Sequence, residues 1–239
     1  MNTSEILKRW GSLEWLLTQA RDLLFDAHDS LSRTEFARLY RSVRPYSMAG
    51  NARLRGLHRA VRHVVSSGIP GDIVECGTAR GGSAALMGLT LKGLRARRPL
   101  WVFDSFEGLP TPSERDPDLA IAVRYIGSCV GALKEVRELF DKLDILADAH
   151  FVKGLFQVTV PRSEIGAIAV LHLDGDWYES VRVCLDHLYD RVSSGGVIQI
   201  DDYGHWEGAR AAVDDFIRER ALHTHLRYLD YTGRQMIKP

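Results

Sequence analysis

Apolar and polar positions follow two different patterns along this chain, one in the N-terminal part and another from Gly71 onward. In residues 4–27 and 52–67 the apolar side chains recur every three or four positions, which predicts two amphipathic helices, the first with Ser4 as its N-cap. A second short helix is expected within residues 30–50. From Gly71 onward, short β-branched runs alternate with helical segments, which is typical of a doubly wound, mostly parallel sheet.

The alternating pattern after Gly71 predicts a series of strands and helices. The expected strands cover residues 72–76, 100–103, 150–153, 168–173 and 196–200, and the expected helices cover residues 82–96, 130–146, 178–192 and 207–220. Two last strands, near 225–229 and 234–238, flank a Thr-Gly turn and predict an antiparallel hairpin. We therefore expect an α/β domain over residues 51–239, preceded by a helical extension or lid over residues 1–50.

Composition narrows the class of protein. The 31 basic and 31 acidic residues balance, so no global field attracts the chain to nucleic acid or to a membrane surface. No apolar run approaches the roughly 20 residues that a membrane span needs, and charged residues interrupt the N-terminus where a signal peptide would stand. Three cysteines without metal-like spacing indicate free thiols in a reducing compartment. We expect a cytoplasmic protein.

The first two strands of the domain end in residues suited to a nucleoside ligand. The first runs into a glycine-rich turn, residues 77–83, that lets the backbone approach a ligand and opens a helix with free N–H groups. The turn lacks the spacing of a dinucleotide or phosphate loop, which argues against a nicotinamide-dependent oxidoreductase. Asp104 ends the second strand, where an acidic residue can bind ribose hydroxyls; the alternative is a cap for the next helix.

Two further strand ends carry four carboxylates. The apolar run 168–171 is followed by Asp174 and Asp176, and the run 197–200 by Asp201 and Asp202. If the two strands are neighbours, these carboxylates meet at one edge of the sheet, where like charges repel strongly. A divalent cation would relieve the repulsion, and all-oxygen ligation suits Mg²⁺, Ca²⁺ or Mn²⁺.

Six runs of residues carry a resemblance to a known family. In order and spacing, PYSM, GDIVECGTARGGSA, FDSFEGLP, FVKGLF, LHLDGDWYES and GGVIQIDDYG resemble the TylF/macrocin O-methyltransferase family over about residues 44 to 238. The resemblance implies a Rossmann-like class I methyltransferase fold, a mostly parallel seven-stranded sheet with an antiparallel C-terminal strand. It also implies S-adenosylmethionine and Mg²⁺ as cofactors, a small-molecule acceptor with a sugar hydroxyl, as in antibiotic biosynthesis, and a homo-oligomer.

The resemblance also implies roles for individual residues. Asp174, Asp201 and Asp202 correspond to the metal ligands, and Asp176 to the general base. In an extended run, residues 172, 174 and 176 would face one side, so Asp174 could bind the metal while Asp176 reaches the hydroxyl. The alternatives for Asp176 are a second metal ligand or a cap of the helix 178–192. The implied cofactor-binding residues are Tyr46, Met48, Glu75, Gly77, Thr78, Gly81, Gly82, Ser83, Asp104, Ser105, Gly154, Leu155, Phe156 and Asp174.

The sequence identifies residues of the acceptor pocket less specifically than residues of the cofactor site. Tyr178, Tyr203, His205 and Trp206 flank the carboxylates and are candidates to line the acceptor pocket, although aromatic residues are also routine packing. His172 stands where the family often has Arg, and we expect it near the acceptor. The alternatives are a sugar hydroxyl of a finished metabolite, the same hydroxyl on a nucleotide-sugar precursor, or a catechol. A non-catalytic protein of this fold would tolerate loss of acidic site residues, yet all four are present.

Overall fold

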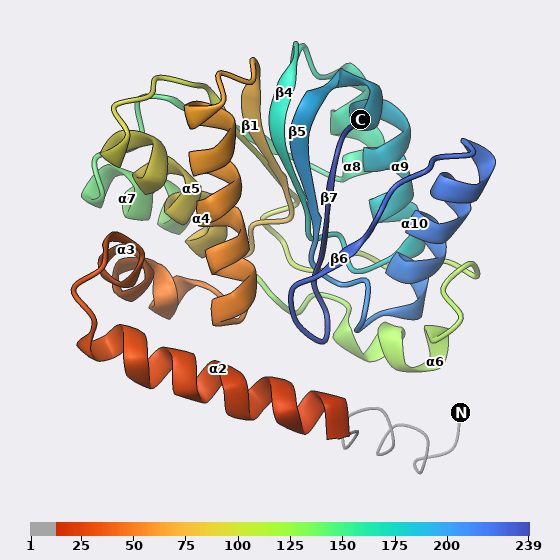
Figure 1. Ribbon diagram of the computed structural model, residues 1–239. Helices are drawn as coiled ribbons and strands as arrows, with labels where there is room; N and C mark the ends of the chain where they lie inside the picture. The colour runs from red at the N-terminus through yellow and green to blue at the C-terminus, as the bar shows by residue number, and fades with distance from the viewer. Residues whose placement is uncertain (1–12) are drawn as a thin grey trace.

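One twisted sheet forms the centre of the molecule (Figure 1). The computed structural model describes residues 13–239, so the predicted N-cap Ser4 lies outside the described residues. The seven strands lie in the order β3-β2-β1-β4-β5-β7-β6; β7 is antiparallel to β5 and β6, and the other neighbours are parallel. Their bounds are β1 Asp72–Cys76, β2 Leu100–Asp104, β3 Ala149–Lys153, β4 Ile168–Leu173, β5 Val192–Ile200, β6 Arg227–Tyr228 and β7 Arg234–Ile237. The predicted α/β fold and C-terminal antiparallel hairpin are confirmed.

Helices cover both faces of the sheet (Figure 1). On one face lie α4 (Asn51–Ser66), α5 (Gly82–Gly93) and α7 (Leu133–Lys142), and on the other α8 (Phe156–Thr159), α9 (Tyr178–Leu188) and α10 (Glu207–Glu219). Each face has its own apolar core, because the strands are buried on both sides. Before the sheet come α2 (Leu13–Leu31) and α3 (Glu35–Val43), and α6 (Leu119–Ala122) lies in the loop after β2. Among residues 13–239, no helix combines the length and the apolarity needed to cross a membrane.

Some predicted boundaries differ from the structure. The expected helix 178–192 ends at Leu188, and the expected strand 196–200 already begins at Val192. Val192 already pairs with Ile168, and an irregularity in the ladder between β4 and β5 takes up the residues between Val192 and Val197. The expected helix 130–146 is reduced to α7, since Asp144 adopts a left-handed φ of 54° just beyond it.

Two buried aspartates in the loop after β2 fix the starts of two distant helices. Asp116 Oδ1 accepts the Tyr178 N–H that begins α9 (2.7 Å), and Asp118 Oδ2 accepts the Glu207 N–H that begins α10 (3.2 Å). Both aspartates are at most 2% exposed. The first N–H groups of a helix lack partners within it, so these carboxylates supply caps from another part of the chain. The carboxyl ends of β4 and β5 are thereby anchored where each leads into its helix.

We predict that Asp116→Ala lowers the free energy of unfolding by about 2 kcal/mol, because three donors lose a buried acceptor: the Tyr178 N–H and the N–H and hydroxyl of Ser113. Urea unfolding followed by circular dichroism measures the change. Glu114→Ala is the matched control, since Glu114 is exposed in the same loop and should cost less than about 0.5 kcal/mol. Equal losses in the two variants would refute this role of Asp116.

Candidate active site

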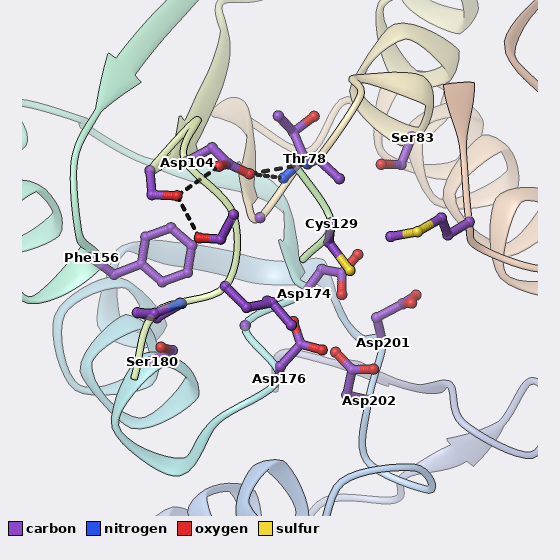
Figure 2. Close-up of a pocket in the computed structure, with 18 of the residues that line it drawn as sticks. Thr78, Ser83, Asp104, Cys129, Phe156, Asp174, Asp176, Ser180, Asp201 and Asp202 are labelled. Carbon is purple, nitrogen blue, oxygen red and sulfur yellow. Dashed lines mark hydrogen bonds between the residues drawn. The ribbon is translucent and has the colours of Figure 1, made fainter. Parts of the chain in front are cut away.

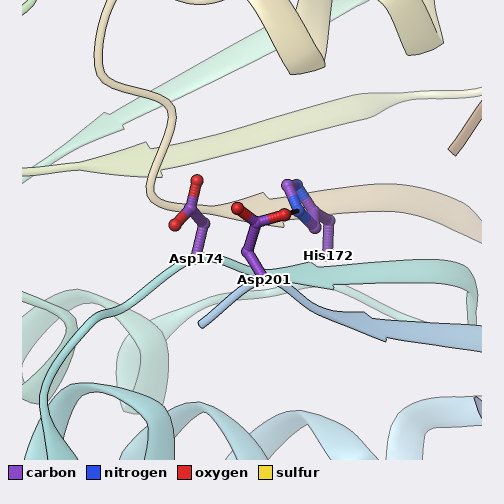
Figure 3. Close-up of side chains that lie close together, drawn as sticks. All are labelled: His172, Asp174 and Asp201. Carbon is purple, nitrogen blue, oxygen red and sulfur yellow. Dashed lines mark hydrogen bonds and ion pairs between the residues drawn. The ribbon is translucent and has the colours of Figure 1, made fainter. Parts of the chain in front are cut away.

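Four carboxylates meet at the carboxyl ends of β4 and β5. These strands are parallel neighbours, so Asp174 and Asp176 emerge beside Asp201 and Asp202, as the sequence predicted (Figure 2). Carboxylate oxygens of Asp174, Asp176 and Asp202 lie within 4.8 Å of one another, and so do ligand atoms of His172, Asp174 and Asp201 (Figure 3). Asp201 and Asp202 are buried, and Asp174 and Asp176 are half-buried.

Asp176 reaches this cluster by a route that the sequence did not predict. The expected extended run is wrong, because β4 ends at Leu173 and Asp176 adopts a left-handed φ of 55°. Its Oδ1 accepts the indole N–H of Trp206 at 3.0 Å. The alternative role as a cap of α9 is also wrong, since Asp116 accepts the Tyr178 N–H. Asp176 therefore remains a candidate base or metal ligand.

A buried arginine that the sequence analysis missed balances part of the charge. Arg53 of α4 bonds Asp201 through Nη1, and its Nε donates to Asp230 Oδ2 at 3.0 Å. Its side chain is 15% exposed. Burial alone would lower the pKa of Arg53, but Asp201 and Asp230 outweigh it and raise that pKa, so the guanidinium stays charged. Burial would raise the pKa of Asp201, but Arg53 lowers it below its ordinary value.

His172 supplies a second positive charge beneath the cluster. Its Nδ1 lies 2.8 Å from Glu75 Oε1 and its Nε2 lies 3.4 Å from Asp201 Oδ1. Burial alone would lower the pKa of His172, but the bonds to Asp201 and Glu75 raise it to about 9. His172 and Glu75 are fully buried and line neither cavity, and His172 contacts both Glu75 and Asp201. The expected positions of His172 near an acceptor and of Glu75 beside a methionine group stay predictions.

The other three carboxylates have no such partner. Burial of the carboxylate is the larger cause, and the negative charge of Asp201 the smaller one, that raises the pKa of Asp202 to about 6. Burial and neighbouring carboxylates also raise the pKa of Asp174 and Asp176 well above the ordinary value. Asp202 Oδ2 is buried and has no hydrogen-bond partner among the described residues. An acceptor-only cluster with an unsatisfied oxygen fits a hard divalent cation such as Mg²⁺.

A first cavity opens beside the cluster, at the ends of β1 and β2 (Figure 2). Gly77 lines it with a φ of 94°, and a Cβ there would lie 1.8 Å from the Asp174 carbonyl oxygen, so only glycine allows this approach. Of the predicted cofactor-binding residues, this cavity is lined by Tyr46, Met48, Gly77, Thr78, Ser83, Asp104, Ser105, Gly154, Leu155, Phe156 and Asp174.

Gly81 and Gly82 do not line this cavity but pack closely beside it, and their contact with a cofactor stays a prediction. A Cβ on Gly82 would lie 2.6 Å from Ser47 Cβ, and a Cβ on Gly81 would lie 2.8 Å from Val136 Cγ1. Gly82 thus lets the loop carrying Tyr46 approach the start of α5 closely. The glycines shape the cavity through the backbone around it.

Asp104 organises the mouth of this cavity. Its Oδ2 accepts the N–H groups of Thr78 (2.7 Å) and Ala79 (3.0 Å), and its Oδ1 accepts the N–H of Phe106 (2.7 Å). The carboxylate therefore ties the glycine-rich turn to the loop after β2. It caps no helix, since the next helix, α6, begins only at Leu119. Contact with a ribose stays a prediction.

A second cavity adjoins the first on the other side of the carboxylates. The two cavities share Arg53, Leu109, Cys129, Asp176 and Asp202. Predicted acceptor residue His205 lines the second cavity, whereas Tyr178 and Tyr203 line neither cavity. The Tyr178 hydroxyl donates to Asp215 and that of Tyr203 to Asp214, and contact of these two tyrosines with an acceptor stays a prediction. Trp206, which the sequence also suggested for the acceptor pocket, lines the second cavity as well. Residues that sequence reasoning missed are Thr18, Gln19, Asp22, Tyr125, Asp230, Tyr231 and Thr232.

The sheet order, the glycine turn and the acidic end of β2 together define a class I S-adenosylmethionine-dependent methyltransferase. The chain belongs to the macrocin O-methyltransferase (TylF) family, whose model matches residues 27–237. It is thus an O-methyltransferase, as the sequence resemblance predicted, and the oxidoreductase alternative is wrong.

Named relatives support this assignment. The chain is 37% identical over 194 residues to a Streptomyces olivaceus 8-demethyl-8-(2,3-dimethoxy-alpha-L-rhamnosyl)-tetracenomycin-C 4'-O-methyltransferase, covering 79% of this chain and 74% of that one. It is 36% identical over 199 residues to the demethyldecarbamoylnovobiocin O-methyltransferase of Streptomyces niveus, covering 80% and 76%. Among solved structures, the O-methyltransferase NovP superposes with a TM-score of 0.76 at 35% identity, covering 81% of this chain and 82% of that chain.

We predict that Arg53→Met destabilises the protein by about 3–5 kcal/mol, because Asp230 would be left buried without its cation and Asp201 would keep only His172. Chemical unfolding in chelator-treated buffer measures the loss. Arg59→Met is the matched control, since Arg59 is exposed on the same helix. A loss below about 1 kcal/mol for Arg53→Met would show that Arg53 does not compensate the cluster.

Proposed function

We propose that this enzyme transfers the methyl group of S-adenosylmethionine to a sugar hydroxyl of a glycosylated metabolite, with the help of a divalent cation. The observation that carries the proposal is the position of the carboxylate cluster. Asp176 and Asp202 border both cavities, so a group bound in one cavity faces a group bound in the other across them. Methyl transfer requires this in-line arrangement of donor, methyl group and acceptor oxygen.

The first cavity is the proposed cofactor site, and the cofactor would supply an electrophilic methyl group. Asp104 already holds the loop at the end of β2 and has remaining lone pairs for ribose hydroxyls. The Thr78 hydroxyl is buried, lines this cavity and has no partner among the described residues. A buried donor without a partner costs free energy, so a polar ligand at this position fits. Leu155 and Phe156 offer apolar surface to the adenine.

Asp174, Asp201 and Asp202 would hold the cation, for which Mg²⁺ is our proposal. A bound Mg²⁺ would lower the pKa of a chelated hydroxyl and orient it. Arg53 and His172 hold Asp201 in place. Asp176 stands at the boundary of the two cavities with a raised pKa, which suits a carboxylate that accepts a proton from the sugar hydroxyl. The Trp206 indole N–H fixes the orientation of that carboxylate.

The second cavity fits a finished glycoside better than a nucleotide sugar. The relatives named above methylate a rhamnosyl tetracenomycin and a decarbamoylnovobiocin, as their names state. Among the described residues that line this cavity, Arg53 is the only arginine or lysine, and Asp201 and Asp230 already engage it. A diphosphate needs free cationic donors, and Asp22, Asp176 and Asp202 would repel it. Trp206 and Tyr231 offer aromatic surface for a sugar ring.

The test is methyl transfer from radiolabelled S-adenosylmethionine to three acceptors: a rhamnosylated aromatic polyketide, TDP-rhamnose and a simple catechol. We expect the glycoside to be methylated only with Mg²⁺ present. We expect Asp176→Asn to lower kcat by about 10²–10⁴-fold while affinity for S-adenosylmethionine changes little, because only the proton acceptor is lost.

The control is Asp186→Asn, an exposed aspartate of α9 that should leave kcat unchanged. Transfer to the catechol alone would favour a catechol methyltransferase. Transfer to TDP-rhamnose alone would assign the enzyme to the nucleotide-sugar stage.

A further inference from the structure

Helix α2 turns polar side chains, rather than its leucines, toward the rest of the chain. Asp29 is fully buried and accepts the Asn51 amide of α4 at 2.8 Å. Asp26 accepts the Tyr40 hydroxyl of α3, whereas Leu24 is 72% exposed. A surface helix of a globular protein normally has the reverse orientation, with its apolar face inward. The inner face of α2 is therefore suited to contact polar groups.

Three residues of α2 form one wall of the second cavity: Thr18, Gln19 and Asp22. Thr18 and Asp22 are four positions apart, so they lie on the same face of the helix. None of the three lines the first cavity, so α2 borders the second cavity on the side away from the proposed cofactor site. All three precede residue 27, where the match to the family model begins, so membership of the family assigns them no role.

Contacts next to Asp22 fix its position in this wall. Arg21 Nη2 donates to the Leu229 carbonyl oxygen at 3.1 Å, and Figure 1 shows α2 next to the turn between β6 and β7. A Cβ on Gly50 would lie 2.3 Å from Asp22 Oδ2, so only a glycine at position 50 leaves room for this carboxylate. The Asp22 carboxylate is thus held against the start of α4, at the edge of the cavity.

The Asp22 carboxylate has no partner of its own. Its side chain is half-buried, yet within residues 13–239 it accepts no hydrogen bond and forms no ion pair, and its Oδ1 is a buried oxygen without a donor. Burial, and after it the negative charge of Asp230, raises the pKa of Asp22. Because a carboxylate removed from water without donors costs free energy, donor groups of a ligand would stabilise it.

The surroundings of Asp22 favour a sugar hydroxyl as the donor. Carboxylates accept strong, charge-assisted hydrogen bonds from hydroxyl groups. A sugar ring in the second cavity has carboxylates on two sides, with Asp176 and Asp202 toward the first cavity and Asp22 on the α2 wall. The hydroxyls of one sugar ring point in different directions, so one hydroxyl can face Asp176 while another bonds Asp22.

We propose that Asp22 is a specificity-determining residue, which accepts a hydrogen bond from a second hydroxyl of the acceptor sugar and thereby selects the hydroxyl that faces Asp176. This inference rests on the proposed function and adds a requirement to it. The acceptor sugar carries at least one free hydroxyl besides the one that is methylated. An acceptor without that second hydroxyl leaves Asp22 without a donor, and a site built to bind a hydroxyl rejects such an analogue strongly.

Deoxy analogues of the acceptor, combined with Asp22→Ala, test the proposal. The probes are a rhamnosylated aromatic polyketide and its monodeoxy forms, each of which lacks one sugar hydroxyl. For the wild type, we expect one deoxy form that is still methylated to lose about 10–100-fold in kcat/KM. In Asp22→Ala, we expect the parent glycoside to lose the same factor, chiefly through KM, and that deoxy form to lose nothing further.

Two further readouts separate this role from a structural one. Because Asp22 has no partner to lose, Asp22→Ala should not lower the stability to urea. Because Asp22 does not line the first cavity, affinity for S-adenosylmethionine should also stay unchanged. The matched control is Leu23→Ala, which alters a 70%-exposed neighbour on α2 outside both cavities and should leave kcat/KM unchanged for every acceptor.

An equal loss of kcat/KM in Asp22→Ala for the parent glycoside and for every deoxy form would overturn the proposal, since Asp22 would then act on the cavity as a whole. Unchanged kcat/KM for the parent glycoside in Asp22→Ala would overturn it as well. If the wild type instead prefers an amino-sugar glycoside and Asp22→Ala loses that preference, Asp22 binds an ammonium group and not a hydroxyl. Failure of the wild type to methylate any glycoside would contradict the proposed function, and this inference with it.

Discussion

The structure depends on how one buried carboxylate, that of Asp201, is held at the end of the sheet. Asp201 lies between Arg53 and His172, and those two cations permit four carboxylates to sit together at the ends of β4 and β5. The arrangement ties the ends of the chain to its centre. Arg53 comes from the helix before the sheet, and its second partner, Asp230, comes from the turn before β7, where Asp230 also accepts the N–H groups of Thr232 and Gly233.

Two consequences follow for the site. Asp201 is partly neutralised, whereas Asp174, Asp176 and Asp202 keep raised pKa values and face the cavities. The charge that a cation would balance is therefore concentrated where a donor and an acceptor would meet. Helix α2 closes the far side of the second cavity with the polar residues Thr18, Gln19 and Asp22.

Most of the fold could be predicted from the sequence, because the strands and helices follow from local patterns of residues. Buried strands read as β-branched runs, and their carboxyl ends carried the residues that now line the cavities, including Asp104, Asp174 and Asp202. The family resemblance supplied roles that periodicity cannot, and it was least reliable where burial decides. Glu75 and Tyr178 lie beside site residues in the chain, but their side chains are buried against His172 and Asp215.

Long-range charge pairing could not be predicted. Arg53 lies in an amphipathic helix with five other histidines and arginines in residues 52–67, and nothing local distinguishes it from its solvated neighbours. Its role appears only when β5 and the turn at Asp230 come beside it. The caps from Asp116 and Asp118 were missed for the same reason, since they act on helices about 60 and 90 positions later. The reversed polarity of α2 likewise depends on partners in α3 and α4.

We propose that the cluster at the ends of β4 and β5 binds a divalent cation. Calorimetric titration of Mg²⁺ into the protein saturated with S-adenosylmethionine tests it directly, with Asp202→Asn as the variant and Asp141→Asn, an exposed aspartate of α7, as the control. We predict one binding event in the wild type and the control, weakened by at least about tenfold in Asp202→Asn. Absence of Mg²⁺ binding in the wild type, or equal Mg²⁺ affinity in all three proteins, would contradict cation binding by this cluster.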